Sequence, residues 1–347
     1  MTGTLGFGFI GAGAIARYHA QAVAASKGGR LAGVASRRLE SARAFAQEHG
    51  MAFATDDVAK LLAQPGIDAV CITTPSAMHL APALAAIRAG KHLMIEKPLD
   101  STVAGTDQIL REAEAAGVRI GSIFQARFGD AARAVKAAVD GGRFGRMVLA
   151  SCYVKWNRTA EYYTGWKGRL SEDGGGVIIN QAIHGVDLLL WFAGMPVDVF
   201  AWSTQRVHRI ESEDTCVAVL RFASGAFGTI EGTTAAWPGW SRRIELAGEN
   251  GSVIMEDDDI ARWDFRAAQP GDGAIRAAAQ KGEFGSGAAN PMAIKNEGHV
   301  RQIQDFIDGI REKRAFFIEG REARKAVALV RAIYDSAATG RPVQPQD

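Results

Sequence analysis

A carboxylate and an ammonium group are adjacent in the sequence at Glu96 and Lys97, directly before Pro98. Residues 92–95 before them are apolar enough to form a strand buried in a parallel sheet. Pro98 cannot donate to a strand ladder, and it favours an extended backbone at Lys97. The pattern predicts a strand that presents both charges at its carboxyl end, where open α/β sheets bind their ligands. For an isolated Glu-Lys pair, the ordinary interpretation is an ion pair at the surface.

A second group of polar side chains, Asn180, His184 and Asp187, lies in an otherwise apolar segment. The segment follows the glycines at 174–176 and has a helical pattern from Val177. In a helix the three polar residues fall at i, i+4 and i+7 and share one face. A buried polar stripe needs partners, so these residues are candidates for catalysis. The alternative is a core histidine held by Asp187. No second histidine or cysteine occurs at ligand spacing, so no metal site is expected.

These side chains could handle the proton of a secondary alcohol. The ordinary pKa of an imidazole lies near neutrality, which suits His184 as a general base. Lys97 could hydrogen-bond the same oxygen and stabilise a developing alkoxide, and the two roles could be exchanged. Asn180 is neutral, so it can position a hydroxyl group but cannot take its proton.

The chemistry needs a hydride carrier, and the start of the chain predicts a site for one. Residues 4–10 form an apolar strand, and a helical pattern runs to about Ala25. Between them the chain has a G-x-G-x-x-A turn, which lets a pyrophosphate approach the backbone and the helix N-terminus. A further strand at 31–35 completes the spacing of a βαβ unit. The turn is formed by Gly11, Ala12, Gly13, Ala14, Ile15 and Ala16.

The residues after the second strand predict which nicotinamide cofactor is preferred. An acidic residue there would accept hydrogen bonds from the 2′-hydroxyl of NAD(H). This chain has Ser36, Arg37 and Arg38 instead, which could bind a 2′-phosphate. We therefore expect NADP(H) to be preferred, with NAD(H) possible. Further candidate cofactor contacts follow later predicted strands: Thr73, Thr74, Pro75, His79, Glu96, Lys97 and Gln125.

The order of predicted elements indicates two domains. Strands and helices alternate up to residue 126, which predicts a Rossmann domain, a doubly wound parallel α/β sheet. Strand-like segments then dominate from 146 to 256, which predicts an α+β domain over 127–347 with a large, mostly antiparallel open sheet. Residues 268–290 have no clear periodicity and suggest a surface excursion. Helices near 297–313 and 321–339 close the chain and could pack back on the first domain.

The composition of the chain indicates which kinds of partner and which location to expect. The chain has 347 residues, a formal net charge of +2 and no run of basic residues, so nucleic acid is not expected. Its three cysteines are far apart, and neither a signal peptide nor a membrane span is apparent, so we expect a cytoplasmic protein. In residues 214–222 apolar side chains face both ways, which predicts a partner subunit on the open sheet, as a homodimer or homotetramer.

Taken together, these motifs resemble the Gfo/Idh/MocA oxidoreductase family, the glucose-fructose oxidoreductase and inositol dehydrogenase group. The resemblance covers the whole chain and implies that Lys97 and His184 flank the substrate above the nicotinamide. It implies that Trp166 and Lys167 reach the cofactor from the second domain. Many members have aspartate where this chain has Asn180. The motifs that carry the resemblance are the glycine turn, Thr74-Pro75, Glu96-Lys97-Pro98, the 174–187 segment and the tail from 320 to 341.

The expected activity is hydride transfer between a nicotinamide and a secondary alcohol or ketone of a sugar, cyclitol or nucleotide sugar. Two alternatives share the fold: a glycoside hydrolase that retains its cofactor, and a non-catalytic NAD(P)-binding regulator. Such regulators tend to lose the lysine or the histidine, and this chain keeps both. Candidate substrate contacts, chosen because tyrosine and tryptophan stack on sugar faces, are Tyr153, Lys155, Tyr163 and Trp237.

Overall fold

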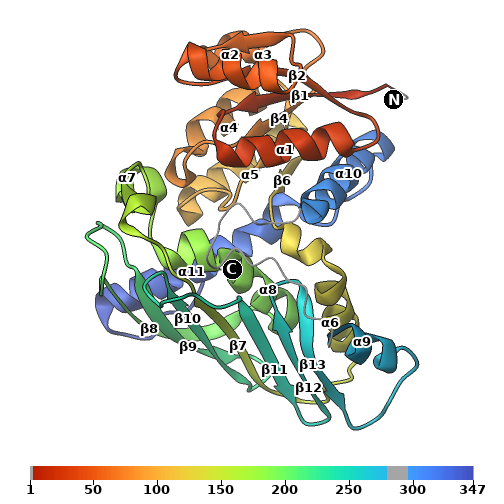
Figure 1. Ribbon diagram of the computed structural model, residues 1–347, viewed down its shortest axis with the longest axis vertical. Coiled ribbons are helices and arrows are strands. Elements are labelled where there is room, and N and C mark those ends of the chain that lie inside the picture. Colours follow the sequence, from red (N-terminus) through yellow and green to blue (C-terminus); the bar gives the residue numbers. More distant parts are fainter. Residues whose placement is uncertain (1–2, 280–295, 347) are drawn as a thin grey trace. The chain divides into compact units, whose positions relative to one another are not determined.

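A computed structural model describes residues 3–279 and 296–346 of the chain (Figure 1). The chain divides into two compact units. The first unit contains residues 1–125 and 296–327, and the second contains residues 126–295 and 328–347. The division after residue 125 lies one residue from the boundary expected from the sequence. The segment 296–327 belongs to the first unit, so the long helix α11 (Gly320–Thr339) starts in one unit and ends in the other.

The first unit is built on a six-stranded sheet in the order β3-β2-β1-β4-β5-β6, and every neighbouring pair is parallel. The order reverses between β1 and β4, as in a doubly wound Rossmann sheet. This confirms the predicted fold class. The strands are β1 (Leu5–Ile10), β2 (Gly29–Ala35), β3 (Phe53–Thr55), β4 (Ala69–Ile72), β5 (His92–Ile95) and β6 (Ile120–Ser122).

Helices cover both faces of this sheet, which explains why its strands are apolar throughout. One core contains Phe7, Phe9, Phe45 and Phe306. It is formed with helices α1 (Ala14–Ala25), α2 (Leu39–Glu48) and α10 (Glu297–Glu312). A second core lies under α3 (Val58–Leu62), α4 (Leu80–Arg88) and α5 (Val103–Ala116). The carboxyl ends of the strands thus remain for ligands.

The second unit has a seven-stranded sheet in the order β13-β12-β11-β7-β10-β9-β8 (Figure 1). Only β7 and β10 are parallel neighbours, so the sheet is mostly antiparallel, as predicted. Helices α6 (Asp130–Asp140) and α8 (Ile183–Ala193) pack on it. The strands are β7 (Met147–Lys155), β8 (Pro196–Thr204), β9 (Thr215–Phe222), β10 (Phe227–Thr233), β11 (Arg243–Gly248), β12 (Gly251–Glu256) and β13 (Asp259–Phe265).

Two parts of the second unit differ from the sequence prediction. β13 was not predicted, because only Ile260 and Trp263 in it are buried and the strand lacks clean alternation. The expected surface excursion at 268–290 contains a helix, α9 (Asp272–Ala279), which packs on β13. Arg143 and Trp263 both bind the Asp272 carboxylate and hold the start of this helix. Residues 280–290 of the predicted excursion lie outside the described part of the chain.

One described stretch, Leu170–Ala193, is long and apolar enough to cross a membrane by length and composition. Within its most apolar window, 78% is buried inside the structure. Burial of this extent is typical of the core helix of a globular protein, so the stretch is weak evidence for a membrane span. It includes α7 (Leu170–Asp173), the π-helix η4 (Ile178–Ala182) and α8.

Candidate active site

The predicted glycine turn lies between β1 and α1. Gly11 has φ +109°, and a Cβ there would lie 2.7 Å from the carbonyl oxygen of Thr73. Only glycine fits this backbone and this close approach. The Thr73 hydroxyl donates to the carbonyl oxygens of Ile10 and Gly11, at 3.2 and 3.1 Å. Thr73, a predicted cofactor contact, therefore uses its hydroxyl to tie β4 to the turn.

The N-terminus of α1 fits a phosphate group. Gly13 is the N-cap and offers no side chain to the first N–H groups, and the first turn has no acidic residue. A Cβ on Gly13 would meet nothing within 4 Å, and Ala14 is exposed beside it. The free N–H groups and the helix dipole therefore favour an anion here. Gln125, another predicted cofactor contact, has a buried Oε1 without a hydrogen-bond partner in the described residues.

The residues after β2 are accessible. The Ser36 N–H donates to the carbonyl oxygen of Thr55 at 3.1 Å, and its side chain is half-buried. Arg37 and Arg38 are exposed, and Arg38 is the N-cap of α2. Both guanidinium groups stand at a helix N-terminus, where a cation is disfavoured unless an anion offsets it. Their positions are compatible with the predicted cofactor contact.

The loop after β4 is organised by its own hydrogen bonds. The Thr74 hydroxyl donates to the carbonyl oxygen of Met78 at 3.0 Å, and Pro75 precedes the short helix η1 (Ser76–Met78). His79 is fully buried, with Nδ1 2.8 Å from the carbonyl oxygen of Pro98 and Nε2 3.0 Å from that of Thr74. Burial lowers the pKa of His79, although both carbonyls oppose this. The structure places the His79 ring between two loops, and its expected contact with the cofactor stays a prediction.

Glu96 and Lys97 follow β5, as predicted, but their side chains have different environments. Glu96 is buried, 7% exposed, with Oε1 2.5 Å from Nε2 of His19. Its carboxylate is directed into the packed interior, and the expected contact between Glu96 and the cofactor stays a prediction. Lys97 is half-buried at the strand end, and its N–H donates to Glu96 Oε2 at 3.1 Å.

In the second unit, the polar stripe is altered by a π-helix. Residues 178–182 form η4, and the α-helical pattern begins only at Ile183. The wider turn changes the spacing between Asn180 and His184 from that of a regular α-helix, and π-turns occur often at functional sites. Both side chains are half-buried, and Asn180 Nδ2 donates to the carbonyl oxygen of Gly175 at 3.2 Å.

Asp187, a predicted catalytic residue, forms a buried ion pair with Arg127. Its two carboxylate oxygens accept from Nε and Nη2 of Arg127, at 2.7 and 2.6 Å, and both side chains are buried. The guanidinium also lies 5.3 Å from the ring of Trp191. A bidentate, buried ion pair of this kind fixes α8. The predicted part of Asp187 in catalysis stays a prediction.

Glu213 and Tyr334 hold the start of the helical segment that contains η4 and α8. The sequence did not single out either residue as functional. Glu213 accepts from the N–H groups of Gly176 and Ile178, at 2.9 and 3.0 Å, and from the Tyr334 hydroxyl at 2.8 Å. Burial raises the pKa of Glu213, while these hydrogen bonds oppose it. A Cβ on Gly176 would lie 1.8 Å from the Glu213 carbonyl oxygen, so only glycine allows this approach. Asn180 and His184 are therefore carried by a helix anchored at its N-terminus.

Aromatic and cationic side chains gather beside η4. Gln181 donates to the Tyr162 hydroxyl at 3.1 Å, and Lys167 Nζ lies 3.6 Å from the centre of the Tyr162 ring. The guanidinium of Arg158, which is buried, lies 5.3 Å from the same ring. Lys167 also lies 5.9 Å from the ring of Trp166. Two positive charges are thus concentrated next to the residue that follows Asn180.

The predicted substrate contacts do not share one location. Tyr163, half-buried, shares a 2.8 Å hydrogen bond with the Thr234 hydroxyl, and burial raises its pKa to about 12. Tyr153 and Lys155 lie on the open face of the sheet, where they line a hollow of about 570 Å³. Their neighbour Cys152 faces α8 instead, next to Gly185. Trp237 is 84% exposed in the loop before β11. The alternation of β7 therefore separates Tyr153 and Lys155 from the helix that carries His184.

Residues 5–124 match the family described as "Oxidoreductase family, NAD-binding Rossmann fold", and residues 132–254 match the GFO/IDH/MocA C-terminal domain. The chain belongs to the GFO/IDH/MocA oxidoreductase family. Among its relatives is 1,5-anhydro-D-fructose reductase of Ensifer adhaerens, 32% identical over 72% of this chain and 74% of the relative. Inositol 2-dehydrogenase of Rhizobium meliloti is 27% identical over 98% of this chain and 99% of the relative.

Among solved structures, the GFO/IDH/MocA chain is similar to the WlbA dehydrogenase of Bordetella pertussis. That structure is in complex with NADH and UDP-GlcNAcA. The two chains are 31% identical with a TM-score of 0.92, over 100% of this chain and 99% of the other. The relatives are dehydrogenases and reductases, so this protein is an enzyme of the oxidoreductase class.

Within this GFO/IDH/MocA chain, the site predictions fall in both units. Lys97 and the glycine turn belong to the first unit. Asn180, His184, Trp166 and Lys167 belong to the second. The roles of Lys97, His184, Trp166 and Lys167 stay predictions.

Proposed function

We propose that this protein is a nicotinamide-dependent dehydrogenase or reductase acting on a secondary alcohol or ketone of a nucleotide sugar. Sugars and cyclitols form the wider substrate class. The observation that carries the proposal is the exposed N-terminus of α1 beyond Gly11 and Gly13, in the same Rossmann unit as Lys97 at the end of β5. The turn and the helix N-terminus would hold the pyrophosphate. When bound there, the nicotinamide supplies the hydride acceptor or donor.

Side chains of the protein must take up or return the proton of the substrate hydroxyl. We propose that His184 takes or returns the proton of the substrate hydroxyl and that Lys97 hydrogen-bonds the same oxygen, with the roles open to exchange. Asn180 would orient a hydroxyl group. Its amide cannot take a proton, so the base is sought among Lys97 and His184.

A negatively charged substrate is favoured by the second unit. Arg158 and Lys167 both lie against Tyr162, next to the Gln181 that follows Asn180. An anionic group on the substrate would offset these charges. The similar WlbA structure contains UDP-GlcNAcA, which supports a nucleotide sugar as the first compound to test.

The test is a screen of UDP-sugars with and without a carboxylate, free sugars and cyclitols, each with NAD(H) and NADP(H). The change in nicotinamide absorbance is measured. We expect turnover to be highest with a UDP-sugar. Turnover of only uncharged sugars or cyclitols would contradict the nucleotide-sugar assignment. Sugar release without a net absorbance change would indicate the hydrolase alternative, and binding without any turnover would indicate the regulator.

For the cofactor, we propose a preference for NADP(H) on the basis of Ser36, Arg37 and Arg38. Arg37→Ala should raise the KM for NADP(H) much more than the KM for NAD(H), because only NADP(H) has a 2′-phosphate for the guanidinium to bind. Steady-state kinetics with both cofactors measure this. Arg43→Ala, which removes an exposed arginine within α2, is the matched control and should change neither KM. The similar WlbA structure contains NADH, so a wild-type kcat/KM that favours NAD(H) is the result that would refute this proposal.

We also propose that the chain assembles through the open face of its second sheet. Along β9, Cys216 and Ala218 are buried, whereas Val217 and Val219 are 39% and 45% exposed. Other exposed apolar side chains extend the same face on neighbouring strands: Leu149, Trp202 and Phe227. An apolar surface of this extent favours burial against a second copy of the chain. The sequence resemblance also implies a homodimer or a homotetramer.

Val219→Lys is expected to convert the oligomer to monomer, because it places a charge in the apolar face. Light scattering at micromolar concentration measures the mass. Val207→Lys makes the same substitution at a 66% exposed valine outside the strands and should leave the mass unchanged. A wild-type monomer, or an unchanged mass in Val219→Lys, would count against this interface.

We propose a cytoplasmic location on the basis of the three cysteines. Cys71, Cys152 and Cys216 are all free and buried. Burial raises the pKa of each thiol, to about 12 for Cys152. Unpaired cysteines are typical of proteins in a reducing compartment.

A further inference from the structure

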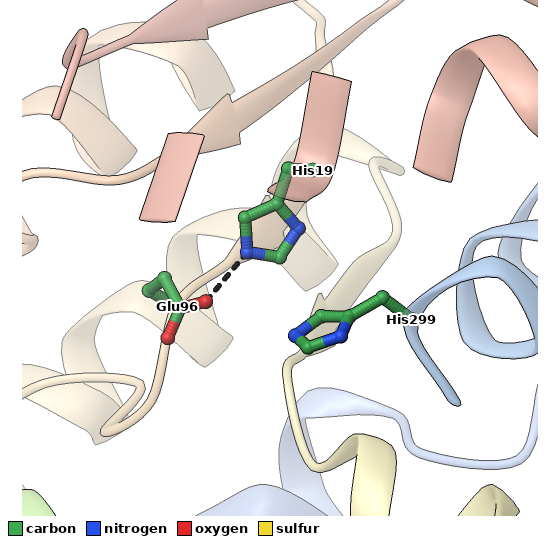
Figure 2. A group of neighbouring side chains, drawn as sticks. All are labelled: His19, Glu96 and His299. Carbon is green, nitrogen blue, oxygen red and sulfur yellow. Dashed lines mark hydrogen bonds and ion pairs between the residues drawn. The ribbon is translucent and has the colours of Figure 1, made fainter. Parts of the chain in front are cut away.

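A buried carboxylate lies directly before Lys97 and makes two hydrogen bonds. Glu96 Oε1 is 2.5 Å from Nε2 of His19 on α1, and its Oε2 accepts the Lys97 N–H at 3.1 Å. His299 on α10 faces the pair, with its ring centre 5.4 Å from that of His19 (Figure 2). All three residues belong to the first unit and are at most 7% exposed. Nothing in the proposed chemistry uses this cluster directly.

The protonation of the cluster follows from its geometry. An ionised carboxylate only accepts hydrogen bonds, so His19 Nε2 donates to Glu96. Burial alone would raise the pKa of Glu96, but the hydrogen bond and charge of His19, with Lys97 and His299 adding, lower it to about 2. Burial and then His19 lower the pKa of His299 to about 3, against the effect of Glu96. Near neutral pH Glu96 is therefore ionised and His299 is neutral.

A metal site is the first alternative, because one ligand atom from each of the three residues lies within 4.8 Å of the others. Two observations count against it. Two ligand atoms on a tetrahedral zinc ion are about 3.3 Å apart, given bond lengths of about 2.0–2.1 Å, so the 2.5 Å contact leaves no room for an ion. A metal-bound histidine usually donates its other ring nitrogen to a partner. Neither His19 nor His299 has a hydrogen-bond partner for Nδ1 among the described residues.

The segment is also held from its other end. The carbonyl oxygen of Pro98 lies 2.8 Å from Nδ1 of the buried His79, whose Nε2 is 3.0 Å from the Thr74 carbonyl oxygen. Lys97 thus lies between two buried anchors: Glu96 with His19 on one side, and Pro98 with His79 on the other. An anchored backbone on both sides of one residue restricts where its side chain can start.

We propose that His19 and Glu96 are a positioning pair for Lys97. His19 holds the Glu96 carboxylate, and the carboxylate holds the backbone N–H of Lys97 at the end of β5. The inference rests on the proposed role of Lys97 in the reaction. The structural part of the inference does not depend on that role: the Lys97 N–H is protected by a carboxylate that needs His19 to stay in place. A shift of the reacting group by about 1 Å costs about 100-fold in rate.

The first measurement is hydrogen exchange of the Lys97 N–H in the full-length, isotopically labelled protein, which needs no substrate. His19→Ala should speed this exchange about two- to tenfold, the factor that corresponds to one hydrogen bond. His19→Gln, whose amide can donate from the same place, should restore slow exchange. His299→Phe keeps a ring at the third position of the cluster and should behave as wild type. Unchanged exchange of the Lys97 N–H in His19→Ala would overturn the proposal, because the hydrogen bond would not depend on His19. Equal acceleration of exchange at Phe9 in β1 would also overturn it, because the effect would then be global.

The second measurement is turnover. His19→Ala should lower kcat roughly 10- to 100-fold while the KM for the nicotinamide stays near wild type, and His19→Gln should recover much of the loss. Faster exchange without any loss of kcat would refute the positioning role. If the wild type turns over no substrate, the proposed function fails, while the exchange result still decides whether His19 holds Lys97. Stoichiometric metal in the purified protein that is lost in His299→Phe would show a metal site instead.

Discussion

Lys97→Ala and His184→Ala are each expected to lower turnover about 10²–10⁴-fold, the usual contribution of a positioned proton donor or acceptor. Cofactor affinity should stay near wild type, because the glycine turn and the α1 N-terminus are formed without either side chain. Stopped-flow and steady-state kinetics with the substrate found in the screen measure both quantities.

Lys60→Ala, which removes an exposed lysine of α3, is the control for Lys97→Ala and should retain wild-type turnover. Near-full activity of either Lys97→Ala or His184→Ala would remove that residue from the mechanism. If a variant lost cofactor binding together with turnover, the substituted residue would be assigned to cofactor contact and not to proton transfer. The pH dependence of kcat in the two variants then shows which residue is the base, since the variant that lacks the base loses the corresponding ionisation.

Arg127→Met is expected to lower the free energy of unfolding by about 3–5 kcal/mol, the usual cost of leaving one partner of a buried ion pair uncompensated. The remaining Asp187 carboxylate is fully buried, so it could not be solvated in the folded protein. Asp187→Leu should cost a similar amount, because it leaves the Arg127 guanidinium buried. Denaturant unfolding of the two variants measures both effects.

The double variant Arg127→Met with Asp187→Leu separates structure from catalysis. Replacement of both charges by apolar side chains is often neutral, so we expect stability to return close to wild type. Turnover of the double variant then tests the predicted catalytic role of Asp187. A double variant that is stable and inactive would support a role of Asp187 in the reaction, whereas retained turnover would contradict it. Additive losses in the double variant would show that the two side chains are not coupled.

Local sequence was sufficient for the features whose physical cause is local. Gly11 and Gly13 were predicted from spacing alone, because a tight turn before a helix requires a positive φ at one position and an open N-terminus at the next. The parallel sheet was predicted from apolar segments alternating with helical ones. The position of Lys97 at a strand end followed from Pro98, which cannot continue a strand.

The sequence was less informative where a side chain's partner is distant in the chain. The contact between Glu96 and His19, 77 residues away on α1, was not predicted. Neither was the ion pair between Asp187 and Arg127, which is 60 residues away and binds both carboxylate oxygens. Glu213 and Tyr334 are separated by 121 residues, and neither has a local pattern that indicates their contact.

The same distinction applies to the predicted substrate contacts. The strand-like pattern correctly indicated that Tyr153 and Lys155 belong to a strand, but it did not indicate which face of the sheet they occupy. In a strand, a residue's face is set by alternation relative to the covered side, and α8 covers the side of Cys152. The sequence by itself determined the glycine turn, the order of the elements and the candidates Lys97 and His184. Only the tertiary structure decided which charged groups are buried in pairs, because a buried charge is defined by the partner that folding brings to it.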